Sequence, residues 1–268
     1  MSGKIFKKSI DAIFIPVLRS KTLLKHIVNH TLRKELEQMS DNGELFPMNH
    51  IHRTIRLAKR LANQDFIILD IGGGIGASLK LFSENFPENK IIVFEPVTEN
   101  FKAIQQRFPS AKNIKFIKYA AGNENTEKQI NLAARITSSS LLQLTSDPGS
   151  GVFNETNLGQ QGVETIRIVR LDDFLEDRSV RIGIMKIDVQ GYELNVLKGA
   201  RTALNRTDLV VLEANNHDGY KGSAKYYEVD QFLRERGFTL YDILPSIVDN
   251  GKLKEWDMIY MNNSARCI

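Results

Sequence analysis

The sequence contains a single cysteine and no long apolar run. Cys267 is the only cysteine among 268 residues, which excludes an internal disulfide and a cluster of metal-binding thiolates. Such low cysteine use is typical of proteins in a reducing compartment. The longest apolar stretch near the N-terminus, from Ile10 to Leu18, is interrupted by Asp11 and Pro16, so it predicts neither a signal peptide nor a membrane-spanning helix. We therefore expect a cytoplasmic protein.

The excess of basic residues lies in the first 34 residues. The formal net charge is +4, but residues 1–34 contain eight Lys and Arg residues against one Asp. The rest of the chain is slightly acidic and has no basic stripe interleaved with aromatic residues, so nucleic acid is not an expected partner. Residues 1–34 also carry apolar side chains at helical spacing, which is typical of a docking helix or lid. Peripheral contact with an anionic membrane surface through residues 1–34 is the alternative interpretation.

From about residue 63 onward, short apolar runs alternate with longer amphipathic stretches. The runs are Phe66–Ile71, Lys90–Phe94, Ile114–Tyr119, Ile182–Ile187, Leu209–Leu212, Phe238–Tyr241 and Met258–Met261. Helical patterns separate most of them, and this alternation predicts βαβ units in a mostly parallel sheet. We therefore predict a doubly wound α/β fold with a seven-stranded sheet over residues 63–268, preceded by an N-terminal helical extension or lid over residues 1–62.

Two segments depart from this alternation. Only a loop, Leu244–Lys254, joins the last two predicted strands, which should therefore form an antiparallel hairpin at the edge of the sheet. Between Tyr119 and Arg181, alternating patches at Gln129–Leu132 and Thr165–Val169 flank a region rich in Ser and Gly. These patches predict an inserted β-hairpin.

A glycine-rich turn follows the first predicted strand. Asp70 lies near the end of that strand, and Gly72, Gly74 and Gly76 follow at alternate positions. Glycine lacks a Cβ, so the backbone of such a turn can approach a ligand closely. The helix that starts near Ser78 would direct its N-terminal amides at an anionic or carboxylate-bearing group. This arrangement predicts one half of a nucleoside-binding crevice.

The second predicted strand supplies the other half of the crevice. Glu95 follows that strand, where an acidic side chain can bind the paired hydroxyls of a ribose. Two cofactors compete for the crevice. The spacing from Gly72 to Ala77 also fits the G-x-G-x-x-A loop of NAD(P)-dependent oxidoreductases. The D-x-G-x-G-x-G pattern that starts at Asp70 is similar instead to the first motif of class I S-adenosylmethionine-dependent methyltransferases.

Five later motifs follow in order along the chain. They are Tyr119-Ala-Ala-Gly-Asn123, Thr137-Ser-Ser-Ser-Leu141, Arg170-Leu-Asp-Asp-Phe174, Met185-Lys-Ile-Asp-Val-Gln-Gly-Tyr-Glu193 and Val196-Leu-Lys-Gly-Ala200. In this order they resemble the FkbM family of methyltransferases, over about residues 64 to 262. The chain departs from the family pattern at Gln190, where members commonly carry Glu, and at Gly74. The resemblance implies a Rossmann-like fold and methyl transfer from S-adenosylmethionine to oxygen, often to a hydroxyl of a sugar or polyketide.

The predicted cofactor contacts come from several separate segments. The residues assigned to S-adenosylmethionine are Asp70, Gly72, Gly74, Gly76, Glu95, Ala121, Asn123 and Ser139. The aspartate and the three glycines would surround the amino-acid part of the cofactor, and Glu95 would bind the ribose. Ala121 or Asn123 would meet the adenine edge, and Ser139 is a further candidate from the insertion.

The predicted catalytic residues lie at the carboxyl ends of two strands, where ligands bind in such sheets. Asp188 is assigned a role near the methyl group or the acceptor hydroxyl, together with Glu213. A carboxylate that only caps the next helix, through the amides of Gly191 or Tyr192, is the alternative for Asp188. His217, in the polar loop after Glu213, is the candidate general base, and a solvated loop histidine is the alternative.

The sequence does not determine the identity of the methyl acceptor or whether the reaction needs a metal ion. Asp188, Glu213 and Asn215 form an oxygen-rich set that leaves Mg²⁺ or Ca²⁺ as an alternative, but no metal ligand is assigned. The predicted acceptor is a small molecule or a glycan, and the sequence predicts no oligomeric state. An NAD(P)-dependent oxidoreductase is the alternative function, although no hydride-transfer site is found. A cofactor-binding module without activity is disfavoured by the two strand-end carboxylates.

Overall fold

The computed structural model describes residues 50–133, 139–143, 160–215, 220–249 and 252–265. Residues from Asn49 onward form one compact unit. Residues 1–49 of the predicted extension or lid, which include the basic segment 1–34, and His217 lie outside the described residues. The predicted boundary at residue 62 stays a prediction, although the helix just before it belongs to the compact unit. Within the described ranges, no helix is long and apolar enough to cross a membrane.

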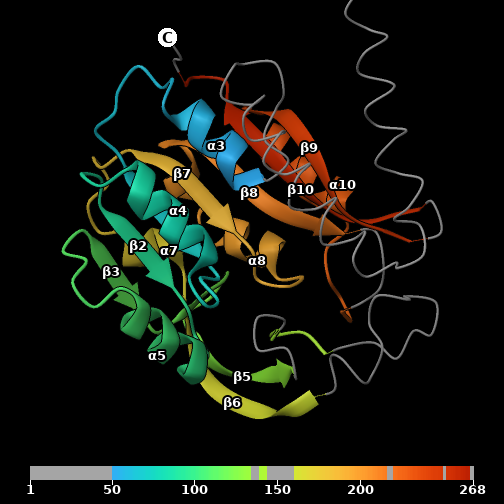
Figure 1. The fold of residues 1–268 in the computed structure, drawn as a ribbon. Helices are drawn as coiled ribbons and strands as arrows, with labels where there is room; N and C mark the ends of the chain where they lie inside the picture. Colours follow the sequence, from blue (N-terminus) through green and yellow to red (C-terminus); the bar gives the residue numbers. More distant parts are fainter. Residues whose placement is uncertain (1–49, 134–138, 144–159, 216–219, 250–251, 266–268) are drawn as a thin grey trace, which may run out of the picture. The chain divides into compact units, whose positions relative to one another are not determined.

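A seven-stranded sheet lies at the centre of the compact unit, in the order β3-β2-β1-β7-β8-β10-β9 (Figure 1). The strands are β1 (Ile67–Ile71), β2 (Ile91–Phe94), β3 (Ile114–Ile117), β7 (Ile182–Ile187), β8 (Thr207–Asn215), β9 (Phe238–Asp249) and β10 (Lys252–Asn262). The first five strands in this order pair in parallel. Only β10 runs antiparallel to its neighbours, β8 and β9. The predicted seven-stranded, mostly parallel sheet is confirmed.

Helices cover both faces of this sheet. The helices are α3 (His50–Ala58), α4 (Ala77–Asn85), α5 (Thr98–Arg107), α7 (Leu171–Phe174), α8 (Glu193–Lys198), α9 (Arg201–Leu204) and α10 (Tyr226–Arg234). The first three contribute apolar side chains to the core on one face, and the last four to the core on the other. Neighbouring strand residues point to opposite faces, so Ile68 belongs to one core and Leu69 to the other. The predicted doubly wound α/β fold is confirmed.

The last two strands form the predicted antiparallel edge hairpin, but the loop between them is shorter than the sequence indicates. The prediction of a loop over Leu244–Lys254 is wrong, because β9 continues to Asp249 and β10 begins at Lys252. Pro245, which reads as a loop signal, lies within β9 opposite Trp256. Since β9 is the edge strand, it can accommodate a residue that has no backbone N–H to donate to a neighbour.

The predicted inserted hairpin is also present. β5 (Thr126–Ala133) pairs antiparallel with β6 (Gln160–Val169), and the short β4 (Ala120–Ala121) pairs in parallel with β6. Ile130 and Ile168 form a small apolar core with Val97, which precedes α5. The backbone N–H of Thr98 donates to the Glu164 carboxylate at 3.0 Å. The insertion is therefore packed against the start of α5, beside the carboxyl end of β2.

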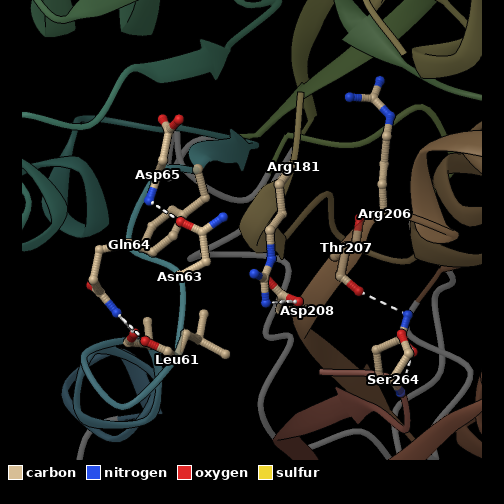
Figure 2. A network of polar contacts seen from close by, with 12 residues as sticks. Leu61, Asn63, Gln64, Asp65, Arg181, Arg206, Thr207, Asp208 and Ser264 are labelled. Atoms are coloured by element: carbon tan, nitrogen blue, oxygen red, sulfur yellow. Dashed lines mark hydrogen bonds and ion pairs between the residues drawn. The ribbon is translucent and has the colours of Figure 1, made fainter. Parts of the chain in front are cut away.

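A polar network connects the amino ends of β7 and β8 to the carboxyl end of β10 (Figure 2). The Arg181 guanidinium, just before β7, donates two hydrogen bonds of 2.6 and 2.7 Å to the Asp208 carboxylate in β8. The Asn262 amide of β10 donates to the Thr207 carbonyl oxygen at 3.0 Å. These contacts align β7, β8 and β10 at one end of the sheet. The carboxyl ends of the parallel strands lie at the other end.

Two glycines from separate family-like motifs lie in contact. A Cβ at Gly199, just after α8, would lie 1.8 Å from the carbonyl oxygen of Gly122. The φ angle at Gly199 is −85°, which any residue adopts. The requirement for glycine at this position is therefore steric. Two of the motifs that carry the family resemblance thus form one packing contact between α8 and the start of the insertion.

Replacement of Gly199 by alanine should destabilise the fold. The added methyl group cannot fit without movement of the backbone at Gly122, so we expect Gly199→Ala to lower the free energy of unfolding by about 1–3 kcal/mol. Urea unfolding followed by circular dichroism measures the change. Lys198→Ala, at the adjacent exposed helical position, is the control and should change the midpoint little. Equal midpoints for the two variants would contradict the steric role of Gly199.

Candidate cofactor and acceptor site

A cavity of about 240 Å³ opens at the carboxyl ends of β1, β2 and β7. One wall consists of the glycine turn after β1 and of residues 94–97 after β2. Another wall consists of Lys186, Asp188, Val189 and Gln190 at the end of β7. Residues 119–121 and three residues of the insertion, Ile130, Ser139 and Leu141, also line the cavity. The pocket thus lies where parallel α/β sheets bind their ligands.

The glycine turn approaches β7 so closely that no side chain fits at residue 72. A Cβ at Gly72 would lie 1.8 Å from the backbone oxygen of Asp188. The φ angles of Gly72, Gly74 and Gly76 are +81°, +52° and +84°, a region that residues with side chains rarely adopt. The backbone of the turn, rather than side chains, therefore forms this wall of the pocket.

Glu95 connects the glycine turn to the end of β2. Its carboxylate accepts hydrogen bonds from the backbone N–H groups of Gly74, at 2.8 Å, and Val97, at 2.9 Å. The Asn100 amide also donates to it, at 3.4 Å. The side chain is only 4% exposed, and this burial raises the pKa of Glu95 to about 7 although the two backbone hydrogen bonds act to lower it. Glu95 therefore titrates near neutral pH and holds the turn in place.

Lys186 connects two carboxylates through the centre of the sheet. Its ammonium group lies 3.4 Å from the Asp70 carboxylate and 3.4 Å from the Asp188 carboxylate, and it donates a hydrogen bond of 2.9 Å to the Gly72 carbonyl oxygen. Burial alone would lower the pKa of Lys186, but the charges of Asp188 and Asp70 outweigh it and raise that pKa. Lys186 is therefore a buried cation that fixes β1, β7 and the glycine turn to one another.

The two carboxylates differ in exposure. Asp70 is fully buried, and this burial raises its pKa even though Lys186 opposes the rise. The Asp188 side chain is 39% exposed and lines the pocket. Burial would also raise the pKa of Asp188, but the Lys186 charge and a hydrogen bond from Gln190 outweigh it and lower that pKa. Asp188 thus presents a negative charge to the pocket, while Asp70 supports Lys186 from behind.

Gln190 connects Asp188 to Glu213. Its side-chain amide donates to the Asp188 carboxylate at 3.1 Å and to the Glu213 carboxylate at 3.3 Å. Glu213 does not line the cavity, and its pKa lies well above the ordinary value because the group is buried and close to the Asp188 charge. The Tyr220 hydroxyl donates to the Gln190 amide oxygen at 3.0 Å.

The family model described as the methyltransferase FkbM domain matches residues 70–240. The chain belongs to the FkbM methyltransferase family. The match covers the glycine turn, the insertion, and Asp188, Glu213 and Tyr220 around Gln190. The family resemblance expected from the sequence motifs is confirmed, and methyl transfer rather than hydride transfer is the reaction of the family.

Two named proteins are similar to this FkbM methyltransferase. "Methyltransferase 1" of Beauveria bassiana is 26% identical over 192 residues, which is 66% of this chain and 73% of that protein. "Hexuronic acid methyltransferase AglP" of Haloferax volcanii is 26% identical over 193 residues, 71% of this chain and 73% of that protein. A solved structure of a putative rRNA methylase from Clostridium thermocellum has a TM-score of 0.50 and 9% identity, covering 82% of this chain and 99% of that chain. The solved structure supports the Rossmann-like methyltransferase fold alone.

The structure brings together most, but not all, of the residues predicted for the cofactor. Those that line the cavity are Gly72, Gly74, Glu95, Ala121 and Ser139. The other three lie next to the cavity lining but do not contribute to it: Asp70 is behind Lys186, Gly76 precedes α4, and Asn123 is exposed and accepts a hydrogen bond from the Tyr192 hydroxyl at 3.4 Å. Their roles in cofactor binding stay predictions.

The predicted catalytic residues are likewise divided. Asp188 lines the cavity, Glu213 accepts a hydrogen bond from Gln190 behind the lining, and His217 lies outside the described residues. Of the two amides that were the alternative partners of Asp188, that of Gly191 donates to Glu193 instead, at 3.1 Å, as does the backbone N–H of Val189. The described residues contain no group of three His, Cys, Asp or Glu side chains arranged for a metal ion.

The sequence patterns did not indicate a role for two residues of this FkbM methyltransferase site, Lys186 and Gln190. Lys186 could have been found, because it is a lysine within the apolar run Ile182–Ile187 and lies opposite Asp70 in the parallel register. A charged residue in a buried strand requires a partner of opposite charge. Gln190 is noticeable only as a departure from the family pattern, and no spacing in the sequence indicates that it reaches Glu213.

Removal of the Lys186 charge should destabilise the fold strongly. We expect Lys186→Met to lower the free energy of unfolding by about 3–5 kcal/mol, because Asp70 would remain buried without its cation. The loss should be smaller at pH 4.5 than at pH 8, since a buried Asp70 with a raised pKa takes up a proton as the pH falls. Urea unfolding at both pH values measures this.

Two further variants test the charge as the cause. The double variant Lys186→Met with Asp70→Asn should recover part of the lost stability, because no buried charge is then left unpaired. Lys90→Met, at an exposed lysine before β2, should have little effect. An equal loss in the single and double variants would contradict the ion-pair explanation.

Proposed function

We propose that this FkbM methyltransferase binds S-adenosylmethionine in the cavity and transfers the methyl group to the oxygen of a hydroxyl on a sugar or another small molecule. The observation that carries the proposal is the pocket itself. The glycine turn, Glu95 and Asp188 meet at the carboxyl ends of three parallel strands and leave a cavity of about 240 Å³. Its lining suits a nucleoside that carries a positive charge.

The residues present fit this cofactor better than they fit a dinucleotide. Glu95 and Asp188 both line the cavity, and the only cation in the described lining is Lys186, which is already engaged by two carboxylates. A pyrophosphate would therefore face negative charge without a free cation. Glu95 still has acceptor capacity for ribose hydroxyls, and the backbone of residues 72–74 leaves space for the amino-acid part. When bound, S-adenosylmethionine supplies an electrophilic methyl group on a positively charged sulfur.

The side chains at the end of β7 supply the remaining chemistry. The Asp188 carboxylate stays ionised beside Lys186 and faces the cavity, so it can orient an acceptor hydroxyl by accepting its hydrogen bond. The proton leaves as the oxygen forms its new bond to carbon, and it needs a base. The predicted His217 is one candidate for this base, and Glu213, whose pKa is raised and which lies behind Gln190 rather than in the cavity lining, is the other. A divalent metal at Asp188 and Glu213 is not part of the proposal.

The assignment to a hydroxyl acceptor draws on one relative. The similar protein from Haloferax volcanii is named as a hexuronic acid methyltransferase, and sugars offer hydroxyls as methyl acceptors. Together with the resemblance noted in the sequence, this supports a glycan or sugar-like acceptor. The proposed site of action of the protein is the cytoplasm, as the sequence predicts.

Calorimetric titration distinguishes the proposed cofactor from a dinucleotide. We expect S-adenosylhomocysteine to bind with a dissociation constant in the micromolar range, and NAD⁺ to show no binding, because only the former lacks a pyrophosphate. The titration is made with and without EDTA. Binding of NAD⁺ alone would contradict the proposal.

The methyl acceptor is then sought by incubation with S-adenosylmethionine and matched pairs of methyl glucoside and methyl glucuronide, with S-adenosylhomocysteine release as the readout. Mass spectrometry of the product identifies an O-methyl ether.

Cofactor affinity should depend on the ionisation of Glu95. Because burial places its folded-state pKa at about 7, most Glu95 carboxyls are protonated at pH 6 and ionised at pH 8. Protonation removes an acceptor from the Gly74 amide or from the ribose, so affinity for S-adenosylhomocysteine should rise by about tenfold from pH 6 to pH 8. Glu95→Gln should bind more weakly and show little change over this range.

The stability of the ligand-free protein should change in the opposite direction. A raised folded-state pKa means that the contribution of Glu95 to stability is present below its unfolded value of 4.5 and is lost as the pH rises through about 7. Glu193 is the matched control for the pH dependence of cofactor affinity. Burial raises its pKa to about 7 as well, but it does not line the cavity. Glu193→Gln should therefore keep the pH dependence of cofactor affinity. Loss of that dependence in Glu193→Gln alone would contradict the role of Glu95.

A further inference from the structure

Gln190 has a backbone conformation that residues with side chains seldom adopt. Its φ angle is +55°, the only positive value at a non-glycine position among the described residues, and the next residue, Gly191, has φ +93°. A side chain at Gly191 is disfavoured further, since a Cβ there would lie 3.1 Å from the Ser223 Cβ. Two consecutive residues of positive φ reverse the chain after β7. Such outliers concentrate at functional sites, where the surrounding contacts hold them in place.

The contacts around Gln190 account for this conformation. The Ser140 hydroxyl, from the insertion, donates a hydrogen bond of 2.6 Å to the Gln190 backbone oxygen. The Tyr220 hydroxyl donates to its side-chain amide oxygen at 3.0 Å. With its carbonyl oxygen and its amide oxygen both engaged, the amide nitrogen can only point at Asp188 and Glu213, to which it donates. Two separate segments of the chain thus hold Gln190, one at its backbone and one at its side-chain amide.

That donor group acts on one of the two oxygens of Asp188. The Gln190 amide binds Oδ1 of Asp188, and the Lys186 ammonium lies beside Oδ2. The carboxylate is therefore held from both sides with its plane determined, while it stays 39% exposed toward the cavity. A carboxylate held by one partner alone would be free to rotate, and its charge would be less well placed for a ligand in the cavity.

We propose that Gln190 is a positioning residue for the cofactor: it holds the Asp188 carboxylate toward the cavity so that the pocket favours the positively charged sulfonium of S-adenosylmethionine over the neutral sulfur of S-adenosylhomocysteine. The inference rests on the proposed function, because it takes the cavity as the cofactor pocket. Gln190 supplies no charge itself. It acts through the direction and ionisation of Asp188, next to the counter-charge of Lys186.

The test compares the affinities of the two ligands, which needs no methyl acceptor. Calorimetry gives the ratio of the dissociation constant of S-adenosylhomocysteine to that of S-adenosylmethionine. We expect Asp188→Asn to lower this ratio by about three- to tenfold, the effect of one partly solvated charge. Gln190→Met, which keeps the length of the side chain and removes its donors, should lower the ratio similarly, with affinity for S-adenosylhomocysteine changed by less than threefold.

Further variants keep the test independent of folding defects. Gln190→Asn retains an amide and tolerates positive φ, but it is one methylene too short to reach both carboxylates, so it should behave as Gln190→Met does. Tyr220→Phe removes the hydroxyl that directs the amide and should lower the ratio less. Gln129→Met, the same replacement at an exposed position of β5, should leave it unchanged. Thermal unfolding monitors each variant.

The outcomes that overturn the inference differ from failure of the proposed function. An unchanged ratio in both Gln190 variants, with a lowered ratio in Asp188→Asn, would show that Gln190 does not position the carboxylate. Equal losses of affinity for both ligands in the Gln190 variants would show a general structural role. An unchanged ratio in Asp188→Asn would show that this carboxylate does not face the sulfonium. Failure of the wild-type protein to bind either ligand would instead overturn the proposed function.

Discussion

The buried charge of Lys186 is the constraint on which the pocket depends. A lysine in the middle of an apolar strand is stable only where carboxylates and carbonyl oxygens surround it. Asp70 from the neighbouring strand, Asp188 from the end of its own strand and the Gly72 carbonyl oxygen meet this requirement. The same three contacts fix the direction of the glycine turn and the position of Asp188. The ion pair that stabilises the sheet centre thereby also shapes the ligand cavity.

The motifs behind the family resemblance combine packing with chemistry. Gly122 and Gly199 belong to different motifs, yet their role in the structure is a backbone contact. Asp172, from a third motif, accepts hydrogen bonds of 2.8 to 3.1 Å from the backbone N–H groups at the start of α9. Asp188 and Gln190 share one motif with Glu193, which fastens the turn after β7 through two amides. A motif match therefore predicts the family well, while the role of each residue has to come from its contacts.

Features that depend on local pattern could be predicted from the sequence. The alternation of apolar and amphipathic segments identified the parallel sheet, and the spaced glycines with Glu95 identified the cavity edge. Features that depend on distant neighbours could not. Pro245 indicates a loop in the sequence, but its place on an edge strand lets β9 continue past it. The contact of Gln190 with Glu213 joins residues 23 positions apart, and it requires a positive φ that the residue type does not indicate.

The two sides of the cavity differ in the groups that form them. This difference explains which part of the function can be predicted from the fold. The side assigned to the cofactor consists largely of backbone, held by strand ends, glycines and the Glu95 hydrogen bonds. Backbone geometry follows from the fold, so it identifies the ligand class. The side next to Asp188 consists of side chains from the end of β7 and from the insertion. Glu213 of β8 and Tyr220 hold this side from behind through Gln190. Substitutions there can leave the sheet intact and still change the hydrogen-bonding groups that an acceptor meets. Under the proposed function, the fold therefore determines where the cofactor binds, whereas a few side chains determine which acceptor fits beside it.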